Sequence, residues 1–396
     1  MGLLDPPALS PRAGRGLVGG RRSDGRRDIF FIGSSSTNRD SYESYTGATR
    51  VAFGYFEGLS WPGWAQIESN GRWRFAGLAA QSGYSAAQVR DEFLPVALAA
   101  APWACVVHCG QNGIEDLPGT ISALTDIFTA LLNAGIIPIL VTSQPLDNQA
   151  DTTRVPKLNV WLRRQARRLG VPLIDSHALF TNPATGQWLT AYSDGDQVHS
   201  NTAGAQALGQ LFNTVMDNWL PPTPLAQLNT FQPDTSLLMS KPLMLNASGS
   251  FVEGWSGTLG SNAVVSQDTV AGCDGKMLTV SYTAAGGTTT VVGSTVTLVP
   301  GNRYRLGFKH KLARPGVGRA MFRLAQNPAG TEVRQFGWRV ELPFGLSTYY
   351  QEWVQPAGLS AYAFRPVITL DNSPAAGFAY SIGQFTWENL TANGDA

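Results

Sequence analysis

The sequence has few cysteines, few charged side chains and no long apolar run. Three cysteines in 396 residues, Cys105, Cys109 and Cys273, are too few for a disulfide framework. Charged residues make up 14% of the chain, and 29 basic against 28 acidic side chains leave a net charge of +1. So small a net charge produces only a weak electrostatic field, which does not favour nucleic acid as a partner. No stretch approaches the roughly 18 to 20 apolar residues of a membrane helix, so no membrane span is expected.

The N-terminal segment lacks the apolar core of a secretory signal, because Pro6, Pro7 and Pro11 interrupt it. Residues 1–27 carry six arginines against two acidic residues and are predicted to form a flexible basic arm. The alternative is an arm that becomes ordered on a partner in a larger assembly. The opening MGLLDPPALS resembles those of phage virion proteins, which implies a virion-associated location. A cytoplasmic location is the alternative.

Glycine, proline and tryptophan are abundant, with 43, 24 and 11 residues, and hydrophobic residues make up 43% of the chain. This composition is typical of a loop-rich globular protein. The length predicts two main domains. We expect an α/β domain over residues 28–220, a proline-rich linker over 221–236 and an all-β domain over 237–396.

The first domain alternates buried strands with amphipathic helices. The predicted strands cover residues 29–32, 72–76, 104–108, 136–141 and 171–174, and the predicted helices cover 121–132, 155–169 and 202–219. Such alternation predicts a parallel sheet covered by helices, with ligands at the carboxyl ends of the strands. Beyond the linker, short segments rich in Val, Thr, Tyr, Phe and Trp predict a jelly-roll β-sandwich.

Two segments of the α/β domain together suggest a nucleophile and its base. Ser35 follows the first predicted strand in Gly33-Ser-Ser-Ser36, where a tight turn can expose a hydroxyl group. Asp196 precedes His199 by three residues, just before the last predicted helix. A carboxylate at this spacing can orient the imidazole towards a serine, which makes Ser35, Asp196 and His199 a candidate triad.

Two more strand ends could supply hydrogen-bond donors to an oxyanion. Gly83 could place a backbone N–H near a reacting carbonyl, and the side-chain amide of Asn112 could supply another donor. Together with the strand-end serine and the Asp-x-x-His segment, these segments resemble the four sequence blocks of the SGNH (GDSL-type) hydrolases. The resemblance covers about residues 28–219 and implies a flavodoxin-like three-layer α/β fold.

The resemblance implies roles for individual residues. Ser35 would be the nucleophile, with His199 and Asp196 completing a triad. The N–H groups of Ser35 and Gly83 and the Asn112 amide would form the oxyanion hole, without metal or cofactor. Ser34 and Gly113 depart from the family pattern, which has aspartate at both places. The hydrogen bonds that brace these loops must therefore differ.

Aromatic side chains beside these blocks are candidates for a substrate pocket. Trp61, Trp64 and Tyr84 are predicted to bind substrate, and core packing is the alternative for each. The C-terminal half contains Gly254-Trp-Ser256, Leu298-Val-Pro-Gly301 and Ile382-Gly-Gln-Phe385. With these segments it resembles the galactose-binding-like jelly rolls of carbohydrate-binding modules. Exposed aromatic side chains there could stack on sugar rings, the candidates being Trp255, Trp338, Tyr349, Tyr350, Trp353 and Tyr362.

The two resemblances together imply a carbohydrate esterase that removes O-acetyl or other short acyl groups from a polysaccharide, such as a bacterial surface glycan. One alternative is an inactive virion protein that recognises glycan or has a structural role. Another is a lipase or thioesterase. A homo-oligomer is left open by the sequence.

Overall fold

The computed structural model describes residues 27–39, 41–42, 50–51, 55–147, 153–220, 247–248, 251–313, 318–326, 333–355 and 362–392. The chain divides into two compact units. An α/β unit contains residues 1–39 and 76–219, and a β unit contains residues 40–75 and 220–396. Almost the whole predicted N-terminal arm and the predicted linker lie outside the described residues.

The α/β unit is built on a five-stranded sheet in the order β5-β1-β6-β7-β8. Its strands are β1 (Asp28–Gly33), β5 (Arg74–Ala80), β6 (Ala104–His108), β7 (Ile137–Val141) and β8 (Leu173–Ile174). β1, β6, β7 and β8 pair in parallel. Every residue of β1, β6 and β7 is buried, as expected for strands covered on both faces.

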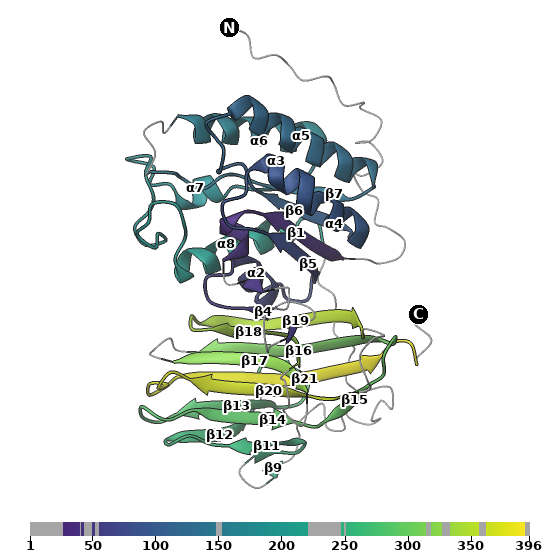
Figure 1. Ribbon diagram of the computed structural model, residues 1–396. Helices are drawn as coiled ribbons and strands as arrows, with labels where there is room; N and C mark the ends of the chain where they lie inside the picture. The colour runs from purple at the N-terminus through teal and green to yellow at the C-terminus, as the bar shows by residue number, and fades with distance from the viewer. Residues whose placement is uncertain are drawn as a thin grey trace. The chain divides into compact units, whose positions relative to one another are not determined.

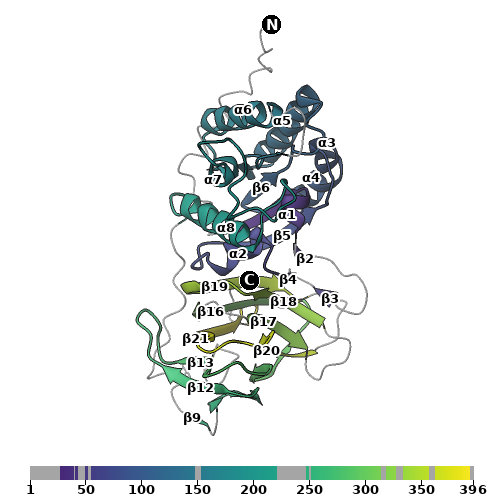
Figure 2. The ribbon, with the colours of Figure 1, turned by 90° about the vertical axis from the view of Figure 1, so that its left-hand side faces the viewer.

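Helices cover both faces of this sheet. In the two views of Figures 1 and 2, α5 (Leu117–Asn133) and α6 (Arg154–Leu169) lie on one side of the strands and α8 (Thr202–Met216) on the other. Phe31 of β1 packs against Phe212 of α8, with ring centroids 6.0 Å apart. The remaining helices are α1 (Ser35–Asn38), α3 (Ala86–Gln88), a π-helical turn (Val89–Phe93), α4 (Leu94–Ala100) and α7 (Ser176–Phe180). The predicted three-layer α/β arrangement is confirmed.

The described part of the β unit contains two large sheets and a two-stranded sheet of β9 and β10. One large sheet has the order β12-β13-β21-β16-β19, and the other follows the path β11-β14-β20-β17-β18-β4-β2, in which β4 is Tyr55–Phe56 and β2 is Ser41–Tyr42. The longer strands are β16 (Arg303–Ala313), β17 (Arg319–Gln326), β18 (Val333–Val340), β19 (Phe344–Val354), β20 (Tyr362–Asp371) and β21 (Ala379–Asn389). The shorter ones are β9 (Ala247–Ser248), β10 (Phe251–Val252), β11 (Trp255–Thr258), β12 (Ala263–Asp268), β13 (Met277–Tyr282), β14 (Thr289–Gly293) and β15 (Val296–Leu298).

Aromatic side chains from both sheets fill the interior of the β unit. The ring of Phe308 in β16 lies 4.5 Å from that of Phe322 in β17 and stacks on Phe385 of β21 at 5.1 Å. Because β17 belongs to one sheet and β16 and β21 to the other, the Phe308–Phe322 contact joins the two inner faces. The C-terminal strands beyond residue 250 pair antiparallel. The prediction of a β-sandwich is therefore confirmed.

One segment lies in a different unit from the predicted one. We expected residues 40–75 in the α/β domain, but they form part of the β unit. They include β2 (Ser41–Tyr42), β3 (Arg50–Val51), β4 (Tyr55–Phe56) and α2 (Trp61–Ile67). β3 and β4 pair in parallel with β18, so the segment extends a sheet formed 280 or so residues later.

Buried polar contacts hold this segment to the sandwich. The Nε2 atom of His310, a fully buried residue, lies 3.1 Å from the backbone oxygen of Ile67, and its Nδ1 atom lies 3.2 Å from the hydroxyl of Tyr380. Gln66 donates to the side chain of Gln351 at 2.9 Å. A buried polar group without a partner is costly, so each of these contacts favours this one placement of α2.

Candidate active site

The nucleophile candidate sits on a tight turn between β1 and α1. Ser35 is the first residue of α1, and the preceding Ser34 donates its backbone N–H to the His108 carbonyl at 3.2 Å. A Cβ atom on Gly33 would lie 2.4 Å from Thr37 Oγ1 and 2.6 Å from the His108 oxygen. Only glycine fits so close an approach, which explains Gly33 at this turn.

The structure joins Ser35, His199 and Asp196 by hydrogen bonds. Ser35 Oγ lies 2.8 Å from His199 Nε2, and His199 Nδ1 lies 2.5 Å from Asp196 Oδ2. The serine and the histidine are 164 residues apart in the chain. An imidazole held in this way by a carboxylate can accept a proton from the serine hydroxyl.

Asp196 is fixed by its own loop. Its Oδ1 atom accepts the backbone N–H groups of Val198 at 2.8 Å and His199 at 2.7 Å. Partial burial works to raise the pKa of the Asp196 carboxyl, but these bonds and the one to the His199 ring outweigh it and hold that pKa well below the ordinary value. Asp196 is therefore an anion at neutral pH and can stabilise an imidazolium.

The loop that carries Asp196 and His199 is anchored at several backbone atoms. Between these two residues, Gln197 adopts a left-handed conformation with φ of +65°, and its carbonyl accepts the N–H of Asp147 at 3.2 Å. Asn201 caps α8 through the N–H of Gly204 at 2.9 Å and donates to the carbonyl of Ser193 at 3.0 Å. His199 thus lies in a segment with a defined conformation.

Gly83 and Asn112 lie in neighbouring loops. Asn112 donates its side-chain N–H to the backbone oxygen of Tyr84 at 3.1 Å, which ties the loop after β6 to the loop after β5. Gly83 has a φ of +84°, is exposed, and a Cβ there would meet no atom within 4 Å. The Gln81 N–H donates to the Gly33 carbonyl at 3.3 Å, so this loop also contacts the turn before Ser35. The oxyanion-hole assignment stays a prediction.

The loops at Ser34 and Gly113, where the family that the sequence resembles has aspartate, are held by bonds to backbone atoms. At Gly113, φ is +76°, and a Cβ would lie 3.2 Å from that of Ser85, so an aspartate would be strained. The Gly113 carbonyl instead accepts the N–H of Asp116 at 3.1 Å and the hydroxyl of Thr120 at 3.2 Å. Ser34 is buried and braces the turn through its backbone. Backbone bonds at both loops thus replace any that carboxylates would make.

The predicted substrate-binding tryptophans do not fit that role. Trp61 and Trp64 are each 1% exposed and belong to α2 of the β unit, where Trp64 packs edge-on against Phe344. The core-packing alternative holds for both. Tyr84 is half-buried, follows Gly83 directly, stacks on Phe93 at 5.2 Å and donates to Glu92 at 2.9 Å.

The candidate sugar-stacking aromatics of the β unit are also mostly buried. Trp255, Trp338, Tyr349 and Trp353 are at most 5% exposed, so none of these four can stack on a sugar as placed. Their size favours the core because a buried aromatic side chain removes a large apolar area from water. Tyr350 is partly exposed, and the side chain of Tyr362 lies outside the described residues.

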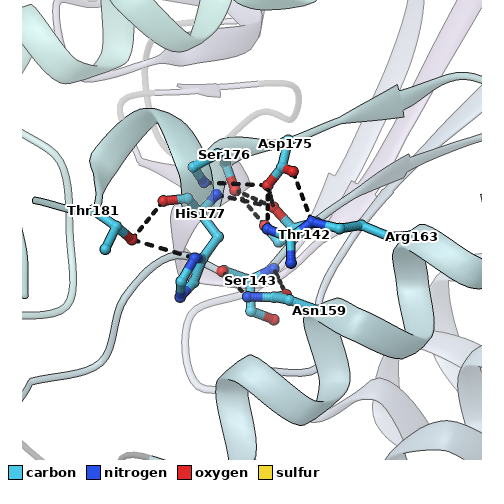
Figure 3. Close-up of polar contacts among 9 residues, drawn as sticks. Thr142, Ser143, Asn159, Arg163, Asp175, Ser176, His177 and Thr181 are labelled. Atoms are coloured by element: carbon cyan, nitrogen blue, oxygen red, sulfur yellow. Dashed lines mark hydrogen bonds and ion pairs between the residues drawn. The ribbon is translucent and has the colours of Figure 1, made fainter. Parts of the chain in front are cut away.

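A second polar cluster stabilises the same edge of the sheet, beyond β7 and β8 (Figure 3). Asp175 accepts two hydrogen bonds from Arg163, at 2.7 and 2.9 Å, and one from Thr142 at 3.1 Å. Partial burial raises the pKa of Asp175, but Arg163 and the other donors lower it further, so the net shift is downward. His177 is half-buried, and burial lowers its pKa. The Asp175 bonds fix the junction between β8 and α7.

Two other titratable groups of the α/β unit, His108 and Cys109, are buried. Burial lowers the pKa of His108 to about 3 and raises that of Cys109 to about 12, so both are uncharged at neutral pH. Among the described residues, no three His, Cys, Asp or Glu side chains gather as metal ligands would. Within the same residues, no helix has the length and apolar character needed to cross a membrane.

Sequence reasoning missed Arg39, which contacts the loop that carries His199. Its guanidinium lies 2.5 Å from Asp194 Oδ2 and donates to the Ser200 carbonyl at 3.1 Å. An isolated arginine four residues after the candidate serine carries no signal of its own. Only the fold brings residues 39 and 194 together.

Several solved structures are similar to about half of this chain. A lipase/acylhydrolase from Enterococcus faecalis is 19% identical, with a TM-score of 0.40, and the match covers 50% of this chain and all of that one. A GDSL-like lipase from Bacteroides thetaiotaomicron is 14% identical, with a TM-score of 0.39 and coverage of 53% and 96%. An acetyl-xylooligosaccharide esterase variant from Geobacillus is 18% identical, with a TM-score of 0.37 and coverage of 48% and 95%.

No curated protein matches this chain in sequence. The family comparison does find a match, and it spans the segment that contains Ser35, Asn112, Asp196 and His199. Residues 31–207 match the GDSL-like Lipase/Acylhydrolase family.

Proposed function

We propose that this protein is a serine esterase that removes O-acetyl or other short acyl groups from a polysaccharide. The main support for the proposal is a pair of hydrogen bonds. One joins Ser35 Oγ to His199 Nε2 at 2.8 Å, and the other joins His199 Nδ1 to Asp196 Oδ2 at 2.5 Å. The family match over residues 31–207 supports acyl-ester hydrolysis as the reaction class.

The proposed reaction begins with proton transfer. His199 Nε2 accepts the proton of the Ser35 hydroxyl as Oγ attacks the ester carbonyl carbon, and Asp196 stabilises the resulting imidazolium. The tetrahedral intermediate then collapses, His199 protonates the departing alcohol, and an acyl-enzyme remains on Ser35. Water, deprotonated by His199, hydrolyses that ester and releases the acid.

Three donors are proposed to stabilise the negatively charged oxygen. The N–H of the first residue of a helix has no acceptor within its own helix, which makes the Ser35 N–H available at the start of α1. The Gly83 N–H and the Asn112 side-chain amide lie on two loops that are hydrogen-bonded to each other through Tyr84. One such donor contributes about 3 kcal/mol to acyl transfer.

The polysaccharide part of the proposal rests on the resemblance of the C-terminal region to carbohydrate-binding modules. A sugar-binding β unit on the same chain would raise the effective concentration of acyl groups at Ser35. A bacterial surface glycan and a place on a virion are the corresponding proposals for substrate and location, with residues 1–27 as an assembly arm.

The proposal is tested on p-nitrophenyl esters of increasing acyl length, with the Ser35→Ala variant beside the parent protein. We expect acetate to be cleaved fastest and the variant to lose at least about 10³-fold in kcat. The matched control is Ser122→Ala, an exposed serine of α5, which should retain parental activity. A preference for long chains would favour a lipase, and no turnover on any ester would favour a glycan-recognition protein.

A further inference from the structure

Arg39 links the helix that carries Ser35 to the loop that carries His199. Its backbone N–H donates to the Ser35 carbonyl at 3.0 Å, so the residue closes α1. Its side chain reaches the other segment, with Nη2 2.5 Å from Asp194 Oδ2 and Nη1 donating to the Ser200 carbonyl at 3.1 Å. The guanidinium thus contacts this loop on both sides of Asp196 and His199.

Asp194 is also hydrogen-bonded to other residues of the loop. Its Oδ1 atom accepts the N–H of Asp196 at 3.1 Å, and its own N–H donates to the His199 carbonyl at 3.1 Å. Asp194 is therefore bonded to Arg39 and to both residues that position the imidazole. Its carboxylate bonds the Arg39 guanidinium and the Asp196 N–H, whereas the Asp196 carboxylate bonds the imidazole, so the two acids have different parts.

The fold gives a reason for an anchor at this place. Arg39 is the last residue of the first segment of the α/β unit, and the chain continues into the β unit at residue 40. α1 has only four residues, so its own hydrogen bonds hold Ser35 weakly. A side-chain contact from Arg39 back to residues 194 and 200 compensates for this short helix.

Charge balance gives a second reason. Among the described residues, three charged side chains are bonded to the loop around His199: Asp196 and Asp194 from the loop itself and Arg39 from the end of α1. The Arg39 and Asp194 side chains are 26% and 19% exposed, so their charges are only partly screened by water. Without Arg39, the negative charge of Asp194 would be uncompensated in the loop that carries His199.

We propose that Arg39 and Asp194 are a positioning pair for the reaction: they hold the Asp196–His199 segment at hydrogen-bonding distance from Ser35, and Arg39 offsets the Asp194 charge in that loop. This inference rests on the proposed esterase function. The contacts of Arg39 and Asp194 described above reach the backbone and carboxylates of the His199 loop, so both residues are proposed to act through His199.

Four variants test the pair: Arg39→Gln, Arg39→Lys, Asp194→Asn and the double variant Arg39→Gln/Asp194→Asn. A partly exposed ion pair contributes only about 0–1 kcal/mol to stability, so all four should fold. We expect Arg39→Gln to lower kcat on p-nitrophenyl acetate about ten-fold or more with little change in KM, because small misplacements of reacting groups are costly. Arg39→Lys should recover part of this loss.

The pH profile separates positioning from a general structural role. Arg39→Gln should move the acidic limb of kcat/KM to higher pH by about half a unit, and Asp194→Asn should move it to lower pH. The double variant should return the limb close to the parent position. A parental kcat in Arg39→Gln, or limb shifts of the same sign in both single variants, would overturn the proposal.

Hydrogen exchange of residues 193–200 provides a readout that needs no activity. We expect faster exchange there in Arg39→Gln, and parental exchange in the control Arg90→Gln, which breaks a surface pair with Asp91 and Asp126. Unchanged protection in Arg39→Gln would overturn the positioning role. If the parent protein cleaves no ester, the esterase proposal fails, while the exchange result still decides whether Arg39 holds the loop.

Discussion

At the level of single residues, the neighbouring carboxylates of Asp196 and Asp194 make different contacts. Asp196 bonds the imidazole and two backbone N–H groups, whereas Asp194 bonds Arg39 and the Asp196 N–H. The spacing in Asp-x-x-His predicts the first of these contacts, since three residues allow the side chain to reach back to the ring. The contact of Asp194 with Arg39 cannot be predicted from spacing, because Arg39 lies 155 positions earlier.

Asp196→Asn should lower kcat by about 10³- to 10⁴-fold. The asparagine could bond the ring in the wrong tautomer and could not stabilise an imidazolium. Steady-state kinetics with p-nitrophenyl acetate measure the loss, and circular dichroism should show an intact fold. If Asp196→Asn kept more than a tenth of the parental kcat, Asp196 would not be the acid of the triad.

At the scale of elements, the β1–α1 turn depends on the absence of a side chain at Gly33. Gly33→Ala would bring a Cβ within 2.4 Å of Thr37 Oγ1 and 2.6 Å of a backbone oxygen that has little freedom to move. We expect a loss of about 1–3 kcal/mol in the free energy of unfolding together with a loss of esterase activity, because Ser35 would shift.

The matched control for this turn is Gly345→Ala, where a Cβ would have no neighbour within 4 Å and φ is not positive. Urea unfolding curves of both variants give the comparison. Equal stability of Gly33→Ala and the parent would show that the turn tolerates a Cβ, contrary to the packing described above.

At the scale of the whole molecule, each unit contains one fully buried neutral histidine, His108 in the α/β unit and His310 in the β unit. Burial lowers the pKa of each to about 3 from a usual value near 6.5. A folded-state pKa below the unfolded one means that the unfolded chain binds more protons in acid. The associated stability is complete above pH 6.5 and is lost as the pH falls towards 3.

Calorimetric Tm values should therefore fall between pH 6.5 and pH 4. His310→Gln, which retains a donor for the Ile67 carbonyl and an acceptor for Tyr380, should have a lower Tm at neutral pH but a shallower fall in acid. An unchanged slope in this variant would mean that other groups determine the acid sensitivity.

Much of the architecture was predictable because it follows from local pattern. The continuous apolar runs at 29–32 and 104–108 predicted fully buried parallel strands, and the 3.6-residue period around Leu124 and Leu158 predicted the helices α5 and α6. Strand ends rich in Gly, Ser and Asn then indicated one edge of the sheet, where Ser35, Asn112 and His199 are found.

Periodicity, a property of consecutive residues, was enough to predict the α/β and β character of the two regions. The candidate triad was predicted from the Asp-x-x-His spacing together with the resemblance of four separate segments to one family. The chain's sequence did not reveal that residues 40–75 belong to the β unit, that Trp61 and Trp64 are core residues, or that Arg39 contacts Asp194. The physical reason is the same in each case. Burial, strand pairing and ion pairing between distant segments depend on which surfaces the whole chain brings together, and no local pattern encodes that choice.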